Sequence, residues 1–160
     1  MLEIPMPANN RRGAIMRCIL VVLAFFVCTS IQAAPPLDLA NLRGQVVYLD
    51  FWASWCGPCR QSFPWMQALS KTYEGQGLAI VAVNLDRDRL DADKFLDQFK
   101  PTFDVRFDPK GDAAEFYKIK GMPASVLIDR HGTPRYIHVG FRPADAAAFE
   151  TQLRELLAEK

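Results

Sequence analysis

Two cysteines, Cys56 and Cys59, lie where the sequence changes from the pattern of a strand to the pattern of a helix. Before them, residues 46–51 are apolar on both sides apart from one acid, which is typical of a central strand covered by helices. After them, apolar residues return every three or four positions, which predicts a helix over about 57–74. The free N–H groups and partial positive charge at the start of that helix favour a thiolate on the first cysteine. This junction therefore predicts an α/β protein with a redox-active dithiol.

Asp50 is the one charged residue in the predicted central strand. A carboxylate near the end of a buried strand must either find hydrogen-bond partners or take a raised pKa. The alternative is that the side chain reaches solvent or caps the helix that follows. The sequence leaves both possibilities open.

The remaining patterns predict further strands and helices. Residues 78–85 form a second buried run without alternation, so a parallel pair with the first strand is the simplest arrangement. Pro64, inside the first helix, is expected to kink that helix without ending it. The other expected elements are helices over about 90–100, 112–120 and 143–159, a short strand over 105–107, and an antiparallel hairpin of strands 125–129 and 134–139.

Residues 1–34 carry the pattern of an export signal, with arginines, then an uncharged run over 18–34 that ends in small residues. The continuously apolar part, 19–27, is shorter than the roughly 20 residues that a membrane span needs. We therefore expect a cleaved signal peptide over 1–34 and a single domain over 35–160, exported to the periplasm. A retained N-terminal anchor, which would hold the protein at the membrane, is the alternative, and Met16 is an alternative start.

Composition narrows the classes of function. The formal net charge is +1, which gives no support for nucleic-acid binding, because that needs a clustered basic face. Of the four cysteines, Cys18 and Cys28 lie in the predicted signal, so only the dithiol pair remains and no structural disulfide is available. A zinc site needs three or four protein ligands, and the domain offers only His131 and His138 besides, both on the predicted hairpin and distal to the dithiol. We therefore expect no metal, and no cofactor other than the redox-active disulfide.

The run Trp-Cys-Gly-Pro-Cys-Arg, residues 55–60, is a specific signal when it follows a strand and opens a helix. Over the whole predicted domain, the sequence resembles the thioredoxin superfamily. In that resemblance Asp50 matches the buried acid, Pro64 the proline of the active-site helix, and Met122-Pro123 the loop whose cis proline faces the dithiol. The implied fold is a thioredoxin-like three-layer sandwich, with helices on both faces of a central mixed sheet.

Within the superfamily, the sequence is similar to the exported TlpA/ResA-like branch. The similarity lies in three segments, 41–44 before the first strand, 83–86 at the end of the second, and 126–132 after the proline loop. Many relatives carry a glutamate three residues after the second cysteine, where this chain has Ser62. The resemblance therefore leaves Asp50 as the acid that would serve the dithiol.

The resemblance also implies roles for individual residues. Cys56 is expected to attack a substrate disulfide, and Cys59 is expected to resolve the mixed disulfide. Asp50 would take up or return the Cys59 proton through water. An extended substrate segment is expected to lie on the residues around the dithiol, namely Trp55, Gly57, Pro58, Met122 and Pro123.

The Gly-Pro pair between the cysteines is similar to that of reducing members of the superfamily. We therefore expect a monomer that reduces disulfides in exported proteins, with apocytochrome c as a candidate substrate and a membrane thiol donor as the source of electrons. A thiol oxidant or disulfide isomerase is the main alternative, because relative thiol stabilities, and not the motif, set the redox potential. A copper chaperone of this fold is a further alternative, although that class resembles CxxxC with a distal histidine, and the two-residue spacing argues against it.

Overall fold

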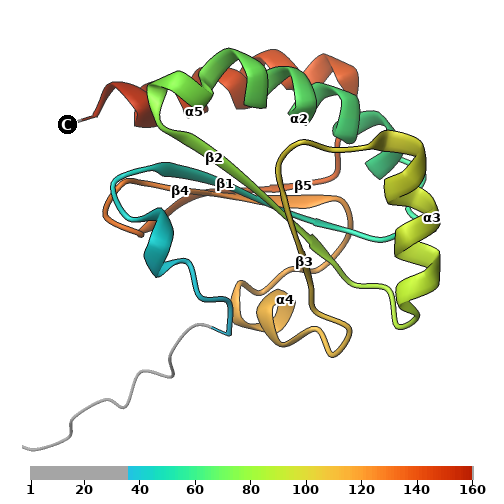
Figure 1. Ribbon diagram of the computed structural model, residues 1–160. Helices are drawn as coiled ribbons and strands as arrows, with labels where there is room; N and C mark the ends of the chain where they lie inside the picture. The colour runs from blue at the N-terminus through green and yellow to red at the C-terminus, as the bar shows by residue number, and fades with distance from the viewer. Residues whose placement is uncertain (1–35, 160) are drawn as a thin grey trace, which may run out of the picture. The chain divides into compact units, whose positions relative to one another are not determined.

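The computed structural model describes residues 36–159 (Figure 1). The predicted signal peptide, residues 1–34, lies outside this range. In chain order, the described elements are the 3-10 helix η1 (Ala40–Leu42), β1 (Val46–Trp52), α2 (Cys59–Tyr73), η2 (Glu74–Gln76), β2 (Leu78–Asn84), α3 (Arg89–Phe99), β3 (Asp104–Phe107), α4 (Asp112–Phe116), β4 (Ala124–Ile128), β5 (Pro134–Val139), η3 (Pro143–Asp145) and α5 (Ala146–Ala158).

The strands form one mixed sheet in the order β3-β2-β1-β4-β5. β1 pairs in parallel with β2, and β2 in parallel with β3. β4 pairs antiparallel with both β1 and β5. The predicted parallel pair and the predicted hairpin are both confirmed. β1 is the middle strand and all seven of its residues are buried, which explains why its sequence is apolar on both sides.

Helices cover both faces of the sheet. α2 and α5 lie side by side across one face (Figure 1), and their apolar side chains join those of α3 in one cluster. α4 lies on the opposite face (Figure 1), over a second apolar cluster. Alternate residues of β1 belong to the two clusters, with Tyr48 and Trp52 on the α2 face and Leu49 and Phe51 on the α4 face. The predicted three-layer arrangement is confirmed.

The first helix begins later than the predicted residue 57. α2 starts at Cys59, because Gly57 and Pro58 form a turn whose carbonyls accept the first backbone hydrogen bonds from Arg60 and Gln61. Cys59 is therefore the first helical residue, and Cys56 lies in the loop before it. The helix continues past Pro64, as expected.

Two other helices differ from their predicted bounds. α4 ends at Phe116 and not at 120, because Lys118 takes a left-handed backbone conformation with φ of 56° and the Ile119 N–H donates to the Ala114 carbonyl. No glycine marks this end, so the pattern of acids and lysines gave no sign of it. Toward the C-terminus, the predicted helix from 143 is a 3-10 turn, η3, followed by α5. Within residues 36–159, no helix is both long enough and apolar enough to span a membrane.

Candidate active site

The dithiol lies at the junction between β1 and α2. Cys56 and Cys59 form a disulfide with an S–S distance of 2.04 Å. The Cys56 N–H donates to the Ala53 carbonyl at 3.0 Å, which closes the loop. The Cys59 N–H donates to Cys56 Sγ at 3.3 Å, so a free amide of the helix start points at the first sulfur. This geometry favours negative charge on Cys56 once the disulfide is reduced.

The two cysteines differ in their access to solvent. Cys56 is 4% exposed and Cys59 is fully buried, so a partner can approach the first sulfur more easily. The residues around Cys56 are open, since Gly57 and Pro58 are exposed and the Trp55 side chain is 72% exposed. A large exposed aromatic ring beside a reactive sulfur is suited to contact with another polypeptide.

The loop before β4 lies at the same end of the sheet. Phe51 pairs with Ala124, so Pro123 adjoins the end of β1 from which the dithiol loop departs. The Met122-Pro123 peptide bond is cis, and Pro123 is buried. Met122 is half-buried and packs against the apolar cluster that contains both cysteines. The structure thus brings the sequence-predicted proline loop and the dithiol to one edge of the sheet.

Asp50 is buried beneath this edge. Asp50 is 2% exposed. It lies between Tyr48 and Trp52 on the face of β1 that packs against the apolar cluster containing Cys59. Burial raises the pKa of Asp50 well above its usual value. Neither Asp50 Oδ2 nor Trp52 Nε1 finds a hydrogen-bond partner among the described residues. The alternative of a solvated or capping side chain is therefore wrong, and α2 has Pro58 at its N-cap without any side-chain cap.

Ser62 occupies the position where many relatives have a glutamate. Its side chain is buried, and its hydroxyl donates to the Cys59 carbonyl at 3.1 Å, one turn back in α2. The hydroxyl is therefore engaged with the helix backbone. This leaves Asp50 as the buried carboxylate on the dithiol side of β1.

A second buried carboxylate, Asp86, lies in the loop after β2 and holds the dithiol loop. It accepts hydrogen bonds from Ser54 N–H at 2.9 Å, Ser54 Oγ at 3.0 Å and Asn84 Nδ2 at 2.7 Å. In addition, the Leu85 N–H donates to the Trp52 carbonyl at 2.9 Å. From the sequence, Asp86 was named only as part of the segment 83–86 that resembles the TlpA/ResA-like branch. Its position could have been predicted, because polar residues at the end of a buried strand parallel to β1 must lie beside the end of β1.

The two histidines differ in position. His131 lies in the exposed turn of the hairpin, as expected. His138 lies on the edge strand β5, two strands from β1, opposite Ser125, which in turn lies opposite Asp50. Within residues 36–159, no three side chains of His, Cys, Asp or Glu come together in a group that could hold a metal ion.

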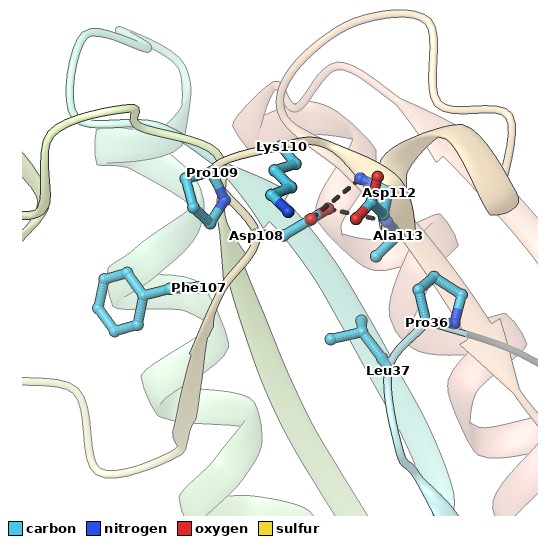
Figure 2. A pocket seen from close by; sticks show the side chains of 8 residues that line it. All are labelled: Pro36, Leu37, Phe107, Asp108, Pro109, Lys110, Asp112 and Ala113. Atoms are coloured by element: carbon cyan, nitrogen blue, oxygen red, sulfur yellow. Dashed lines mark hydrogen bonds between the residues drawn. The ribbon is translucent and has the colours of Figure 1, made fainter.

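A pocket of about 250 Å³ lies on the other side of the sheet, at the start of α4 (Figure 2). Asp108 accepts hydrogen bonds from the backbone N–H groups of Asp112, Ala113 and Ala114, so its carboxylate is used to cap α4. The pocket contains none of the predicted site residues. Its lining residues are Pro36, Leu37, Phe107, Asp108, Pro109, Lys110, Asp112 and Ala113.

Comparison with known proteins gives consistent matches. The profile of the family described as Redoxin matches residues 28–153. Thiol-disulfide oxidoreductase ResA of Oceanobacillus iheyensis is 42% identical over 96 residues, covering 60% of this chain and 50% of the relative. ResA of Geobacillus kaustophilus is 35% identical over 102 residues, covering 64% of this chain and 59% of the relative. The chain thus spans about half to three fifths of the length of these two relatives.

A solved structure is also similar. It is a Chlorobium tepidum protein provisionally assigned as thiol:disulfide interchange protein DsbE, with a TM-score of 0.74 and 56% identity. The match covers 75% of this chain and 85% of that one. The predicted thioredoxin-like fold is therefore confirmed. The Redoxin profile matches well over half of the 160 residues, and the chain is similar to ResA and DsbE proteins. The chain therefore belongs to the Redoxin family, as a ResA-like member of the thioredoxin superfamily.

Proposed function

We propose that this protein is a thiol-disulfide oxidoreductase that reduces disulfides in exported proteins. The observation that carries the proposal is the Cys56–Cys59 disulfide at the start of α2, with a backbone N–H directed at Cys56 Sγ. The names of the ResA relatives and of the DsbE neighbour support the same reaction. Gly57 and Pro58 between the cysteines support the reducing direction.

The first step is nucleophilic attack by the reduced protein. The Cys56 thiolate attacks one sulfur of the substrate disulfide, so that a Cys56–substrate bond forms and the substrate S–S bond breaks. The released substrate thiolate takes a proton from solvent. The α2 N-terminus and the Cys59 N–H favour the thiolate form of Cys56 before attack.

The second step resolves the mixed disulfide. Cys59 gives its proton to Asp50 through water, and its sulfur attacks Cys56 Sγ. The Cys56–Cys59 bond forms and the second substrate thiolate leaves, so two electrons have passed from the protein to the substrate. Asp50 suits this role because burial raises its pKa toward that of a thiol, so that a proton can move between the two groups.

Substrate contact is proposed for the surface around Cys56. Trp55 supplies an exposed ring, Gly57 and Pro58 leave room for a polypeptide, and Met122 supplies apolar surface. The buried cis Pro123 aligns the substrate backbone at the edge of the sheet.

The sequence of the first 34 residues supports a proposal for the setting of the reaction. Their signal-like pattern supports export to the periplasm, with membrane attachment if the segment is retained. In that compartment a membrane thiol donor would regenerate the dithiol of this monomer, and apocytochrome c is the candidate substrate. An oxidant or isomerase would use the same dithiol on different clients.

Trapping tests this proposal. Cys59→Ser, expressed from the full chain in cells, should accumulate mixed disulfides on Cys56, because the resolving thiol is gone. The matched control Cys56→Ser should accumulate none. Mass spectrometry of the trapped partners should identify haem-binding CxxCH peptides and a membrane thiol protein. Recovery of oxidative-folding clients alone would contradict the reducing direction.

A further inference from the structure

The two edges of the sheet differ in how they are protected. β3 forms one edge and carries an ion pair, in which Arg106 Nε lies 2.9 Å from Asp104 Oδ2. Arg106 also donates to the Asp38 carbonyl, so charged side chains and the chain before η1 protect this edge. β5 forms the other edge. Edge strands usually carry charges, prolines or bulges, because an unprotected edge pairs with other chains.

β5 is protected only in the half that lies away from the dithiol. That half begins with Pro134, contains the ion-paired Arg135, and has a register shift in its pairing with β4. The half nearer the dithiol has no proline and no acidic residue, lysine or arginine. Its outward side chains are apolar, since Ile137 is 54% exposed and Val139 is 65% exposed. The device that protects the far half is therefore missing from the near half.

The backbone groups of this apolar half point away from the sheet. The Gly140 N–H donates to the Pro123 carbonyl at 2.7 Å, so Gly140 bonds to the chain that enters β4. Residues that bond to the partner strand alternate along an antiparallel ladder, which makes His138 the next one. The N–H and C=O groups of Ile137 and Val139 therefore lie on the outer side of β5, where no strand of residues 36–159 pairs with them. We call these two residues the free edge.

The free edge lies at the dithiol end of the sheet. Val139 pairs with Ala124, the first residue of β4, and Ala124 pairs with Phe51 near the end of β1. Val139 Cγ1 also lies against Gly121, 3.7 Å from the place that a Cβ would take. β5 thus borders the loop that contains Met122. A substrate polypeptide bonded to the first cysteine must leave the site across this end of the sheet or away from it.

We propose that the free edge binds the substrate polypeptide as an added strand, through a segment that flanks the substrate disulfide. The inference rests on the proposed function. Three strand spacings of about 4.8 Å separate β1 from a strand added outside β5, a distance of roughly 14 Å. About four or five extended residues span that distance. The bound segment therefore begins about four or five residues from the substrate cysteine, and its apolar side chains alternate so that they pack on Ile137 and Val139.

A pair of disulfide peptides tests the added strand. Both contain the same intramolecular disulfide, where one peptide ends. The other continues with a spacer of about five residues and then a segment of alternating valine and threonine. Reduced wild-type protein should act on the extended peptide with a KM roughly tenfold lower and an unchanged kcat, because the extension adds backbone hydrogen bonds and apolar contacts that are made equally in the bound and transition states.

A substitution at the free edge locates the binding. Ile137→Lys places a charge on the edge and should give the two peptides the same KM. Leu90→Lys is the matched control and should keep the tenfold difference, because Leu90 is a similarly exposed apolar residue, 65% exposed, on α3. Reduction of the short peptide by Ile137→Lys would show that this variant is folded.

Methylation of the peptide nitrogens separates strand addition from apolar contact alone. In an added strand, alternate N–H groups face β5. An extended peptide methylated on those nitrogens should have the KM of the short peptide, whereas methylation of the intervening nitrogens should leave the low KM. Equal KM values for the two methylated peptides would overturn strand addition.

Other results would also overturn the proposal. Equal KM values for the short and extended peptides in wild type would remove the free edge as a binding site and leave the reduction of disulfides intact. A tenfold difference that survives Ile137→Lys would place the binding elsewhere. A concentration-dependent dimer of wild type that Ile137→Lys abolishes would assign the edge to a second copy of the chain. A wild-type protein that reduces neither peptide would instead contradict the proposed function.

Discussion

Two buried carboxylates flank the dithiol, and they differ in their partners. Asp86 accepts three hydrogen bonds, two of them from Ser54 in the loop that leads to Cys56. Asp50, on the neighbouring strand, accepts no hydrogen bond from the described residues at Oδ2, and burial raises its pKa. One carboxylate thus holds a loop through its hydrogen bonds, whereas the pKa of the other is raised by burial, so that it is poised to gain and lose a proton.

With these two carboxylates, one edge of a sheet can combine a rigid loop with proton transfer. A carboxylate that accepts several hydrogen bonds fixes the backbone and side-chain groups that donate to it. An unpartnered buried acid contributes nothing to the loop but can exchange a proton with a neighbouring thiol. We therefore propose that Asp86 positions the dithiol loop and that Asp50 takes part in the chemistry.

The largest expected effect is that of Asp50→Asn on the reaction. The amide cannot accept the Cys59 proton, so resolution of the mixed disulfide should slow about 100-fold, equivalent to ~2.7 kcal/mol of barrier. Rapid-mixing kinetics with a disulfide peptide at neutral pH would measure it. Asp86→Asn is the control, and it should retain most of the rate. Equal losses in the two variants would remove the distinction between the carboxylates.

Asp86→Ala should have its largest effect on stability. The substitution leaves the Ser54 N–H and the Asn84 amide without their acceptor, which should lower the free energy of unfolding by about 2 kcal/mol. Urea denaturation of the oxidised protein would measure the change. If Asp86→Ala abolished the pH dependence of the reaction while Asp50→Asn kept it, the assigned roles would be reversed.

The pH dependence of stability should report Asp50. Its pKa is higher in the folded than in the unfolded chain, so the folded protein binds the extra proton between the two values. Stability from this group is complete below the unfolded pKa and is lost as pH rises through the folded pKa, with a slope of at most about 1.4 kcal/mol per pH unit. Asp50→Asn should therefore be more stable than wild type at pH 8, with the gap closing toward pH 4. A gap that widens on acidification would contradict a raised pKa.

Ser54→Ala should produce the smallest change. It removes the Oγ hydrogen bond to Asp86 but keeps the backbone N–H bond, so the free energy of unfolding should fall by about 1 kcal/mol. Thermal unfolding followed by circular dichroism would detect this loss. A cost as large as that of Asp86→Ala would show that the hydroxyl, and not the carboxylate, organises the loop.

Much of the fold could be predicted from the sequence. The sequences of β1 and β2 are apolar on both faces of the strand, which predicted buried parallel strands. The turn before Pro134 predicted the hairpin. The ends of helices were harder, because Lys118 closes α4 in a left-handed conformation that no local pattern signals. α2 begins at Cys59 and not at the predicted residue 57, because hydrogen bonding in the Gly-Pro turn determines where the helix starts and apolar spacing does not.

The site was only partly predictable. The dithiol and the proline loop carry local motifs, and Asp50 stands out as a charge inside an apolar strand. The cross-strand neighbour of Asp50 carries no such signal, because Ser125 is an ordinary residue until strand register places it opposite Asp50. Cross-strand pairs depend on tertiary pairing, so a single sequence cannot reveal them.

The central claim is that Cys56 attacks a substrate disulfide and Cys59 completes the reduction. Its most direct test is mass spectrometry of reduced Cys59→Ser and Cys56→Ser after incubation with a disulfide-bonded peptide. We expect one peptide adduct on Cys56 of the Cys59→Ser protein and almost none on the Cys56→Ser protein. Adducts of equal yield on both variants, or no adduct on either, would contradict it.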